Sequence, residues 1–277
     1  SIPRRLSPKV IKALWLAGIG VGQTFQIIRQ FRPDLVIGTG GYTCGPMVLA
    51  ASLMGVPTAI QEQNVYPGWT NRILGKFVKR IFLADPEAIK YFPKKKVSLP
   101  GNPVRSDEFN SISRPEAEAK LGLEPGKLNL LVFGGSQSAR RINQALLGIL
   151  GRLFQEYPLL QVILVTGTKD FDQIKATVTQ LNLPEDFTNR IKLIPYFYKI
   201  AEAFQVTDLV VARAGAISLA EITCFGIPAI LIPYPYAAGN HQEYNARVLE
   251  RRGAARVILD EELDPESLWT NLALLLN

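Results

Sequence analysis

The chain has 277 residues, of which 47% are hydrophobic and 20% are charged, which describes a globular protein with substantial cores and length for two domains. Its two cysteines, Cys44 and Cys224, lie far apart in apolar surroundings and exclude a disulfide framework. The only histidine is His241, which excludes a metal site built from several histidines. This cysteine usage fits a reducing compartment.

The net charge of +7 is concentrated at the N-terminus. Residues 1–33 hold six basic side chains and no acid, which leaves 25 basic against 24 acidic side chains in the rest. Residues 8–32 are predicted to form an amphipathic helix, whose uncharged part, 13–28, is shorter than the ~20 residues that a transmembrane helix needs. A basic helix bearing Trp15 is typical of a segment on anionic lipid, but a helix that covers a sheet explains the same pattern.

Residues 34–105 predict a first α/β series. A strand at 35–37 runs through the glycine loop 38–43 into a helix at 45–54, and a second strand follows at 57–60. The polar run 61–64 comes next, at the carboxyl end of that strand, where open parallel sheets place ligands. The remaining expected segments are a helix at 69–76, strands at 80–84 and 96–99, a turn-rich crossing at 100–105 and a linker at 106–115.

A second α/β series begins at 128–133, where a strand again leads through glycines into a helix. The expected segments are a glycine loop at 134–141, helices at 142–154 and 171–181, and strands at 160–166 and 190–194. Asp170 and Asp172 superficially match a metal-holding Asp-x-Asp pair, but acids in the first turn of a helix complement its dipole and explain the pattern better. Residues 196–198 offer either a flat apolar contact or core aromatics.

The stretch 209–232 predicts a strand, a turn around Gly215, a helix that Gly226 ends, and a second strand. Backbone N–H groups and the helix dipole favour an anion at such a turn, and Ser218 adds a hydroxyl. Glu221 lies roughly 9 Å along the helix axis from Gly215, a suitable distance between a diphosphate and the ribose diol of one nucleotide. An ordinary helix start with a solvated Glu221 is an equal alternative.

The chain closes with a helix at 242–252, a strand at 255–259 and an apolar helix from Pro265. Two successive α/β halves therefore follow one another, and both place glycine turns at strand ends. The predicted class is α/β, with a ligand in a cleft between the halves as the default hypothesis.

Six motifs occur in an order that resembles the MurG family of glycosyltransferases over essentially the whole chain. They are residues 38–42, 62–64, 101–105, 134–137, 213–221, and His241 and Gln242 with Asn245. The resemblance implies two Rossmann-like domains facing across a cleft (GT-B type), with an acceptor and membrane-side domain at 1–105 and a donor-binding domain at 106–277. It also implies inverting transfer of N-acetylglucosamine from UDP-N-acetylglucosamine to undecaprenyl-linked muramyl-pentapeptide in peptidoglycan synthesis.

The resemblance implies particular contacts as well. Glu221 would bind the ribose diol, Gln242 the donor sugar, Ser136 the diphosphate and Phe197 the uracil ring. The full set of expected donor contacts is Asn64, Arg105, Ser136, Phe197, Ala216, Ile217, Ser218, Leu219, Ala220, Glu221 and Gln242. The expected contacts to the acceptor diphosphate are Thr39, Gly40, Gly41 and Tyr42. We expect peripheral contact with an anionic membrane surface at the cytoplasmic face, and no cofactor, metal or nucleic-acid partner.

The sequence departs from the family at one point. The family begins with a strand and a Gly-Gly-Thr-Gly-Gly-His loop, whose histidine is the proposed general base, and nothing in this sequence matches that loop. We therefore expect a first domain that lacks its first strands and exposes a strand edge, and we assign no catalytic residue. The alternatives are an inactive UDP-sugar-binding module, a UDP-sugar epimerase, for which one histidine is a poor fit, and a lipid-galactose transferase.

Overall fold

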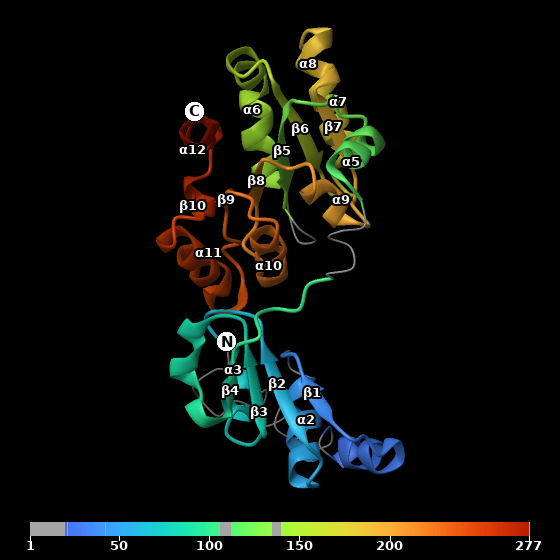
Figure 1. Ribbon diagram of the computed structural model, residues 1–277, viewed down its shortest axis with the longest axis vertical. Helices are drawn as coiled ribbons and strands as arrows, with labels where there is room; N and C mark the ends of the chain where they lie inside the picture. Colours follow the sequence, from blue (N-terminus) through green and yellow to red (C-terminus); the bar gives the residue numbers. More distant parts are fainter. Residues whose placement is uncertain (1–19, 21, 42, 106–111, 135–139, 277) are drawn as a thin grey trace, which may run out of the picture. The chain divides into compact units, whose positions relative to one another are not determined.

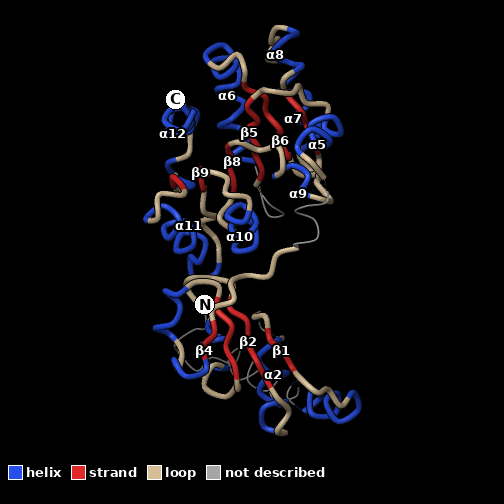
Figure 2. The backbone as a smooth tube through the Cα atoms, viewed as in Figure 1, coloured by secondary structure: helices blue, strands red, loops and turns tan. Residues whose placement is uncertain are grey.

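The computed structural model describes residues 20, 22–41, 43–105, 112–134 and 140–276 (Figure 1). The chain divides into two compact units, residues 1–102 and 103–277. Each unit is a parallel β-sheet with helices connecting its strands (Figure 2). Most of the basic helix predicted at 8–32 lies outside the described residues, but residues 22–31 are helical as expected.

The first unit contains a four-stranded parallel sheet in the order β1-β2-β3-β4. The strands are β1 (Val36–Gly38), β2 (Thr58–Glu62), β3 (Arg80–Leu83) and β4 (Val97–Ser98). The helices are α2 (Cys44–Leu53), α3 (Trp69–Leu74) and the 3₁₀ helices η1 (Pro86–Tyr91) and η2 (Lys94–Lys96). Strand β2 is buried throughout, whereas Leu35 and Ile37 at β1 are each about half exposed.

Gly38 allows α2 to pack closely on β1. A Cβ atom at this position would lie 2.4 Å from the Cys44 sulfur and 2.7 Å from a methyl carbon of Val48. Val48 belongs to the core of the first unit, together with Ile60 of β2 and Ile81 of β3. The glycine that begins the predicted loop is therefore required by helix packing.

The second unit contains a six-stranded parallel sheet in the order β10-β9-β8-β5-β6-β7. The strands are β5 (Leu128–Phe133), β6 (Leu160–Val165), β7 (Ile191–Ile194), β8 (Leu209–Ala212), β9 (Ala229–Leu231) and β10 (Ala255–Val257). In chain order the sheet grows from β5 in one direction through β6 and β7, and in the other through β8, β9 and β10. Strands β5 and β8 pair directly, with Phe133 opposite Ala212, so the order reverses between them.

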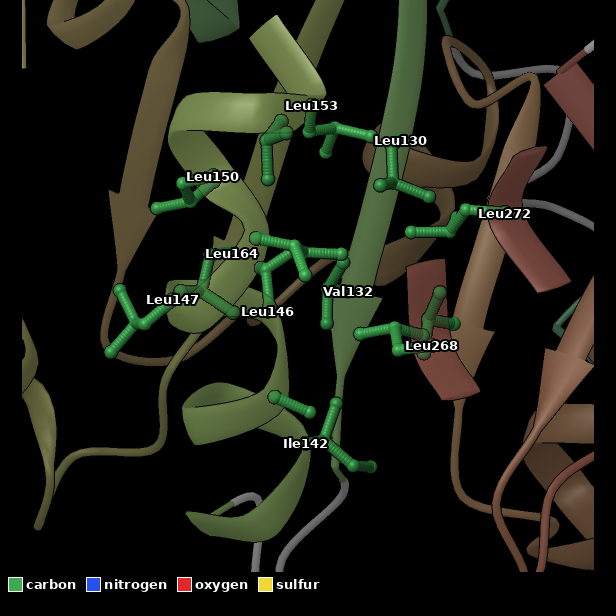
Figure 3. Close-up of a cluster of buried hydrophobic side chains, with 14 of the residues drawn as sticks. Leu130, Val132, Ile142, Leu146, Leu147, Leu150, Leu153, Leu164, Leu268 and Leu272 are labelled. Atoms are coloured by element: carbon green, nitrogen blue, oxygen red, sulfur yellow. The ribbon is translucent and has the colours of Figure 1, made fainter. Parts of the chain in front are cut away.

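Helices cover both faces of this second sheet. They are α5 (Arg114–Leu121), α6 (Arg140–Glu156), α7 (Phe171–Gln180), α8 (Glu185–Asn189), α9 (Ile200–Phe204), α10 (Ala216–Cys224), α11 (His241–Arg251), α12 (Pro265–Leu276) and the 3₁₀ helices η3 (Ala238–Asn240) and η4 (Asp260–Glu262). Side chains of alternate residues in β5 pack into the cores on opposite faces of the sheet. Leu130 and Val132 pack with leucines of α6 and α12 (Figure 3), whereas Leu131 and Phe133 belong to the core that includes α9, α10 and α11.

The structure corrects two predictions about local structure. Part of the predicted linker 106–115 belongs to α5, because Ser113 and Glu116 form a reciprocal capping box at the start of that helix. The backbone N–H of Ser113 donates to the Glu116 carboxylate and lowers the pKa of that group. Strand β2 continues through Gln61 and Glu62, which were predicted to follow it. The Gln61 amide donates to the Asn102 side chain, and the Glu62 carboxylate accepts from the buried Asn71 amide.

Gly38→Ala is expected to lower the free energy of unfolding of the first unit by about 1–3 kcal/mol, because the added methyl group overpacks the contact between α2 and β1. Gly22→Ala is the control, since it lies in a helix with nothing within 4 Å of a built Cβ. Urea denaturation measures both variants. Equal stability of Gly38→Ala and the parent chain would contradict the packing argument.

Candidate functional site

The predicted donor contacts of the second unit follow the carboxyl ends of strands in one sheet. Phe197 follows β7, helix α10 follows β8, and Gln242 lies beyond β9. Ser136 follows β5 but lies outside the described residues. Because β5 and β8 are neighbours, their carboxyl ends form the topological switch point at which open α/β sheets bind ligands.

Helix α10 begins directly after the switch point. Gly215 is its N-cap in an extended conformation, and the first amide that bonds back into the helix is that of Leu219, which donates to the Gly215 carbonyl at 2.9 Å. The amides of Ala216, Ile217 and Ser218 therefore precede the helical hydrogen-bond ladder, and the first turn contains no acidic side chain. This arrangement favours a bound anion.

The predicted contact residues of α10 differ in exposure. Ser218, Ala220 and Glu221 are half-buried, and Ile217 is exposed. Leu219 is buried in the hydrophobic core, so its side chain packs inward and only its backbone can face a ligand. Within the predicted stretch 216–221, Ser218 and Glu221 supply the polar side chains.

Helix α11 is connected to the same edge of the sheet by two amide side chains. The backbone N–H of Tyr234, in the turn after β9, donates to the Gln242 side-chain oxygen at 2.9 Å. The Asn245 amide donates to the carbonyl of Ala214, just before α10, at 3.4 Å. Since Gln242 uses its oxygen for this contact, its amide N–H groups are the donors it can present to a ligand. The contribution of Tyr234 was not predicted from the sequence, because it comes from the backbone.

The aromatic run after β7 is divided between core and surface. Phe197 is half-buried and packs against the core that contains α9 and α10. Tyr196 and Tyr198 are exposed and contact each other edge to face, with ring centroids 5.0 Å apart. Phe197 therefore has a fixed ring at the sheet edge, as an apolar contact to a base requires.

The glycine loop of the first unit joins β1 to α2. Gly40 and Gly41 have φ angles of +98° and +84°, which residues other than glycine rarely adopt. Thr39 and Gly41 are exposed, and the Asn71 amide lies 3.6 Å from a Cβ built at Gly40. Tyr42 lies outside the described residues. The loop therefore exposes backbone beside the N-terminus of α2, which has no acidic residue in its first turn.

Glu62 organises the polar end of β2. Its carboxylate is buried and accepts hydrogen bonds from the backbone N–H and side-chain amide of Asn64, the backbone N–H of Gly68 and the side-chain amide of Asn71. These bonds measure 2.8–3.2 Å. Glu62 is thus a structural acceptor that holds Asn64 in place, and the sequence motif did not reveal the part played by Asn71.

Asn102 connects the Gly-Asn-Pro-Val-Arg segment to the same strand end. Its side-chain oxygen accepts from Gln61 at 2.9 Å, and its amide donates to the carbonyl of Gln63 at 3.1 Å. Arg105 is exposed and belongs to the second compact unit. In the first unit, Asn64 and the glycine loop thus both follow carboxyl ends of neighbouring strands.

The acidic pair considered as a metal motif has other partners. The Asp170 carboxylate accepts from the Arg140 guanidinium at 3.0 Å, and Asp172 lies in the first turn of α7. Among the described residues, no group of three or more histidine, cysteine or acidic side chains is arranged to hold a metal ion. None of the helices in the described part of the chain combines the length and apolar character needed to cross a bilayer.

Comparison with known proteins identifies the family. Residues 1–83 match the glycosyltransferase family 28 N-terminal domain, and residues 129–277 match the C-terminal domain of that family. A UDP-N-acetylglucosamine–N-acetylmuramyl-(pentapeptide) pyrophosphoryl-undecaprenol N-acetylglucosamine transferase from Halothermothrix orenii is 46% identical, over 99% of this chain and 74% of that relative.

Solved structures extend the comparison to the fold. MurG from Acinetobacter baumannii matches with a TM-score of 0.75 and 28% identity, over 100% of this chain and 74% of that one. A UDP-N-acetylglucosamine 2-epimerase described as putative, from Listeria monocytogenes, matches with a TM-score of 0.68 but 13% identity, over 91% of this chain and 69% of that one. At that identity the second likeness shows a shared fold alone.

Together, two parallel-sheet α/β units and matches to both domains of glycosyltransferase family 28 define a glycosyltransferase of the GT-B type. The chain belongs to glycosyltransferase family 28, and within it to the MurG family. The resemblance inferred from six motifs, the α/β class with two Rossmann-like domains and the expectation of a glycosyltransferase are therefore confirmed.

Glu62→Ala is expected to destabilise the first unit by about 3 kcal/mol, because it removes the charged acceptor of the buried Asn71 amide and of donors on Asn64 and Gly68. Hydrogen exchange read by mass spectrometry should show faster exchange in residues 36–102 and no change in 128–276. Glu62→Gln retains one acceptor oxygen, so the exchange rate of its first unit should lie between those of the parent chain and Glu62→Ala. Unchanged exchange throughout the first unit would show that the carboxylate has no structural role.

Proposed function

We propose that the chain transfers N-acetylglucosamine from UDP-N-acetylglucosamine to undecaprenyl-linked muramyl-pentapeptide in peptidoglycan synthesis, and so contributes to cell-wall growth, cell shape and division. The observation that carries this proposal is the start of α10 at the switch point, with Glu221 one turn beyond the amides that precede the helical hydrogen-bond ladder. The name of the relative from Halothermothrix orenii, 46% identical over 99% of this chain, describes the same transfer.

On the donor side, the proposed roles follow from the chemistry of each group. The amides at the start of α10 bind the diphosphate, and they stabilise the negative charge that UDP gains as the bond to the sugar breaks. The Glu221 carboxylate accepts hydrogen bonds from the ribose hydroxyls, and Gln242 donates to hydroxyls of the sugar. Ser136 adds a diphosphate contact and Phe197 an apolar contact to the uracil ring. Ala216 to Ala220 supply the remaining backbone contacts.

On the acceptor side, the glycine loop Thr39 to Tyr42 binds the diphosphate of the lipid-linked substrate through backbone amides beside the N-terminus of α2. Asn64, held by Glu62, and Arg105 contact the donor. The acceptor sugar hydroxyl loses its proton to a base and attacks the anomeric carbon, and UDP leaves from the opposite face, which inverts the configuration. No residue of this chain is assigned as that base.

The alternative functions have less support. The likeness to an epimerase of 13% identity concerns the fold, and the two domain matches name a glycosyltransferase family. An inactive UDP-sugar-binding fragment is favoured by no observation on this chain. A lipid-galactose transferase would share the fold, but the relative that is 46% identical is named as an N-acetylglucosamine transferase.

Glu221→Ala is expected to weaken binding of UDP-N-acetylglucosamine about 10- to 100-fold, because hydrogen bonds to a charged group contribute about 1.5–3 kcal/mol. Calorimetric titration with UDP and with UDP-N-acetylglucosamine measures the loss. Glu185→Ala, which removes an exposed acid from the first turn of α8, is the matched control and should bind like the parent chain. A folded parent chain that binds neither ligand would overturn the donor-site assignment.

We also propose that the first unit contacts an anionic membrane surface peripherally, at the cytoplasmic face. Trp69, Ile73 and Phe77 are spaced one turn apart along α3 and the turn that follows it, and they are 68%, 43% and 48% exposed. Lys76 and Lys79 are exposed in the same segment. Large apolar side chains interleaved with lysines are typical of a surface that lies on negatively charged lipid. The basic N-terminal segment would add to this attraction.

The double variant Trp69→Ala/Phe77→Ala is expected to bind vesicles containing phosphatidylglycerol at least about tenfold more weakly, because burying one large apolar side chain contributes about 1.5–3 kcal/mol. Vesicle sedimentation measures the binding, and raised salt should weaken it for the parent chain. Leu274→Ala, at an exposed leucine of α12, is the control. Equal vesicle binding by the double variant and the control would exclude this surface as the lipid contact.

A further inference from the structure

Asp260, the first residue of η4, lies between two arginines of the second unit. One of its oxygens accepts a hydrogen bond from Arg213 at 2.5 Å, and the other lies 3.6 Å from Nε of Arg141. The side chains of Arg213 and Asp260 are 7% and 10% exposed, whereas that of Arg141 is 48% exposed. The contact to Arg213 is therefore a buried ion pair, and the contact to Arg141 reaches the surface.

Each arginine lies in or just before the first turn of a helix that follows the switch point. Arg213 ends the buried run of β8 and is followed by Ala214 and Gly215, the N-cap of α10. Arg141 is the second residue of α6, the helix that follows β5. Because β5 and β8 are paired neighbours, Asp260 links the starting points of the two helices that flank the switch point.

Arg213 also fixes the turn after β9. Its guanidinium donates to the carbonyls of Ile232 and Pro233, both at 3.3 Å, and lies 5.6 Å from the ring centroid of Tyr234. The backbone N–H of Tyr234 in turn donates to Gln242. While this buried guanidinium makes these directed contacts, the Asp260 carboxylate compensates its charge.

We propose that Asp260 is a positioning residue for the donor diphosphate. The proposal rests on the proposed function, because it takes the start of α10 as the place where the diphosphate binds. Asp260 holds Arg213 and Arg141 so that the amides of α10 and the start of α6 keep a fixed relative position. The two guanidinium groups share the Asp260 carboxylate, one through each of its oxygens.

The test compares UDP with uridine, which has no diphosphate, by ligand-observed NMR titration of the full chain. In Asp260→Asn, UDP is expected to bind about tenfold more weakly, while the affinity for uridine stays within about twofold, because only the diphosphate contacts lose their geometry. Asp260→Glu, which keeps the charge, should recover part of the UDP affinity. Glu261→Gln, at the exposed neighbouring acid of η4, is the control.

The outcomes separate this proposal from the proposed function. If the parent chain binds UDP and Asp260→Asn binds UDP equally well, or loses UDP and uridine in parallel, the positioning role is wrong and the donor site stands. If the folded parent chain does not bind UDP, both proposals fail.

A second measurement applies if Asp260→Asn does not fold. In ligand-free Arg141→Ala, backbone amides of residues 213–219 are expected to exchange hydrogen faster than in the parent chain, because the contact between Arg141 and Asp260 is lost. Arg140→Ala, which removes a neighbouring arginine that pairs with Asp170, is the matched control and should leave that exchange unchanged. Equal exchange in Arg141→Ala and Arg140→Ala would overturn the proposal that Asp260 connects the two helix starts. The measurement uses ligand-free protein because an Arg141 that only contacted phosphate would not change exchange there.

Discussion

The pairing of β5 with β8 is the constraint on which the second unit depends. In a parallel sheet all strands end at the same edge, so each connection to a helix passes that edge. The reversal of strand order between β5 and β8 sends their two helices to opposite faces, and both helices follow the same edge of the sheet. Helix N-termini concentrate partial positive charge, and Arg141 and Arg213 lie close to the starts of these two helices.

Buried polar side chains fix the loops that the backbone alone would leave loose. Glu62 accepts four hydrogen bonds from residues that follow β2, and Asp260 compensates Arg213 beside the start of α10. In both units a largely buried carboxylate thus accepts hydrogen bonds from protein donors near the edge where the parallel strands end. A carboxylate that faces the ligand, such as the one proposed at Glu221, works only if the backbone around it is held in this way.

The sequence was sufficient to predict the helices, the strands and the family, but it did not predict these side-chain contacts. Predominantly apolar runs, interrupted in β5 by Asn129, predicted β5 and β8 with the bounds they have, because strands buried on both faces are apolar along their length. The partners of Glu62 and Asp260 lie up to 9 and 119 residues away along the chain, and no local pattern encodes such pairings. Leu219 was predicted to contact the donor from its place in a motif, although the helical period turns its side chain into the core.

Comparison of Glu62 with Glu221 shows why residue type and motif are insufficient to assign a role. Glu62 is the last residue of β2, and Glu221 lies in the helix that follows β8. Glu62 is 3% exposed and its oxygens are used by Asn64, Gly68 and Asn71, so a ligand would have to displace native hydrogen bonds to reach it. Glu221 is half-buried, one helical turn beyond amides that precede the helical ladder. The different roles proposed for the two acids therefore rest on their accessibility, since Glu62 is closed off by the protein and Glu221 is partly exposed.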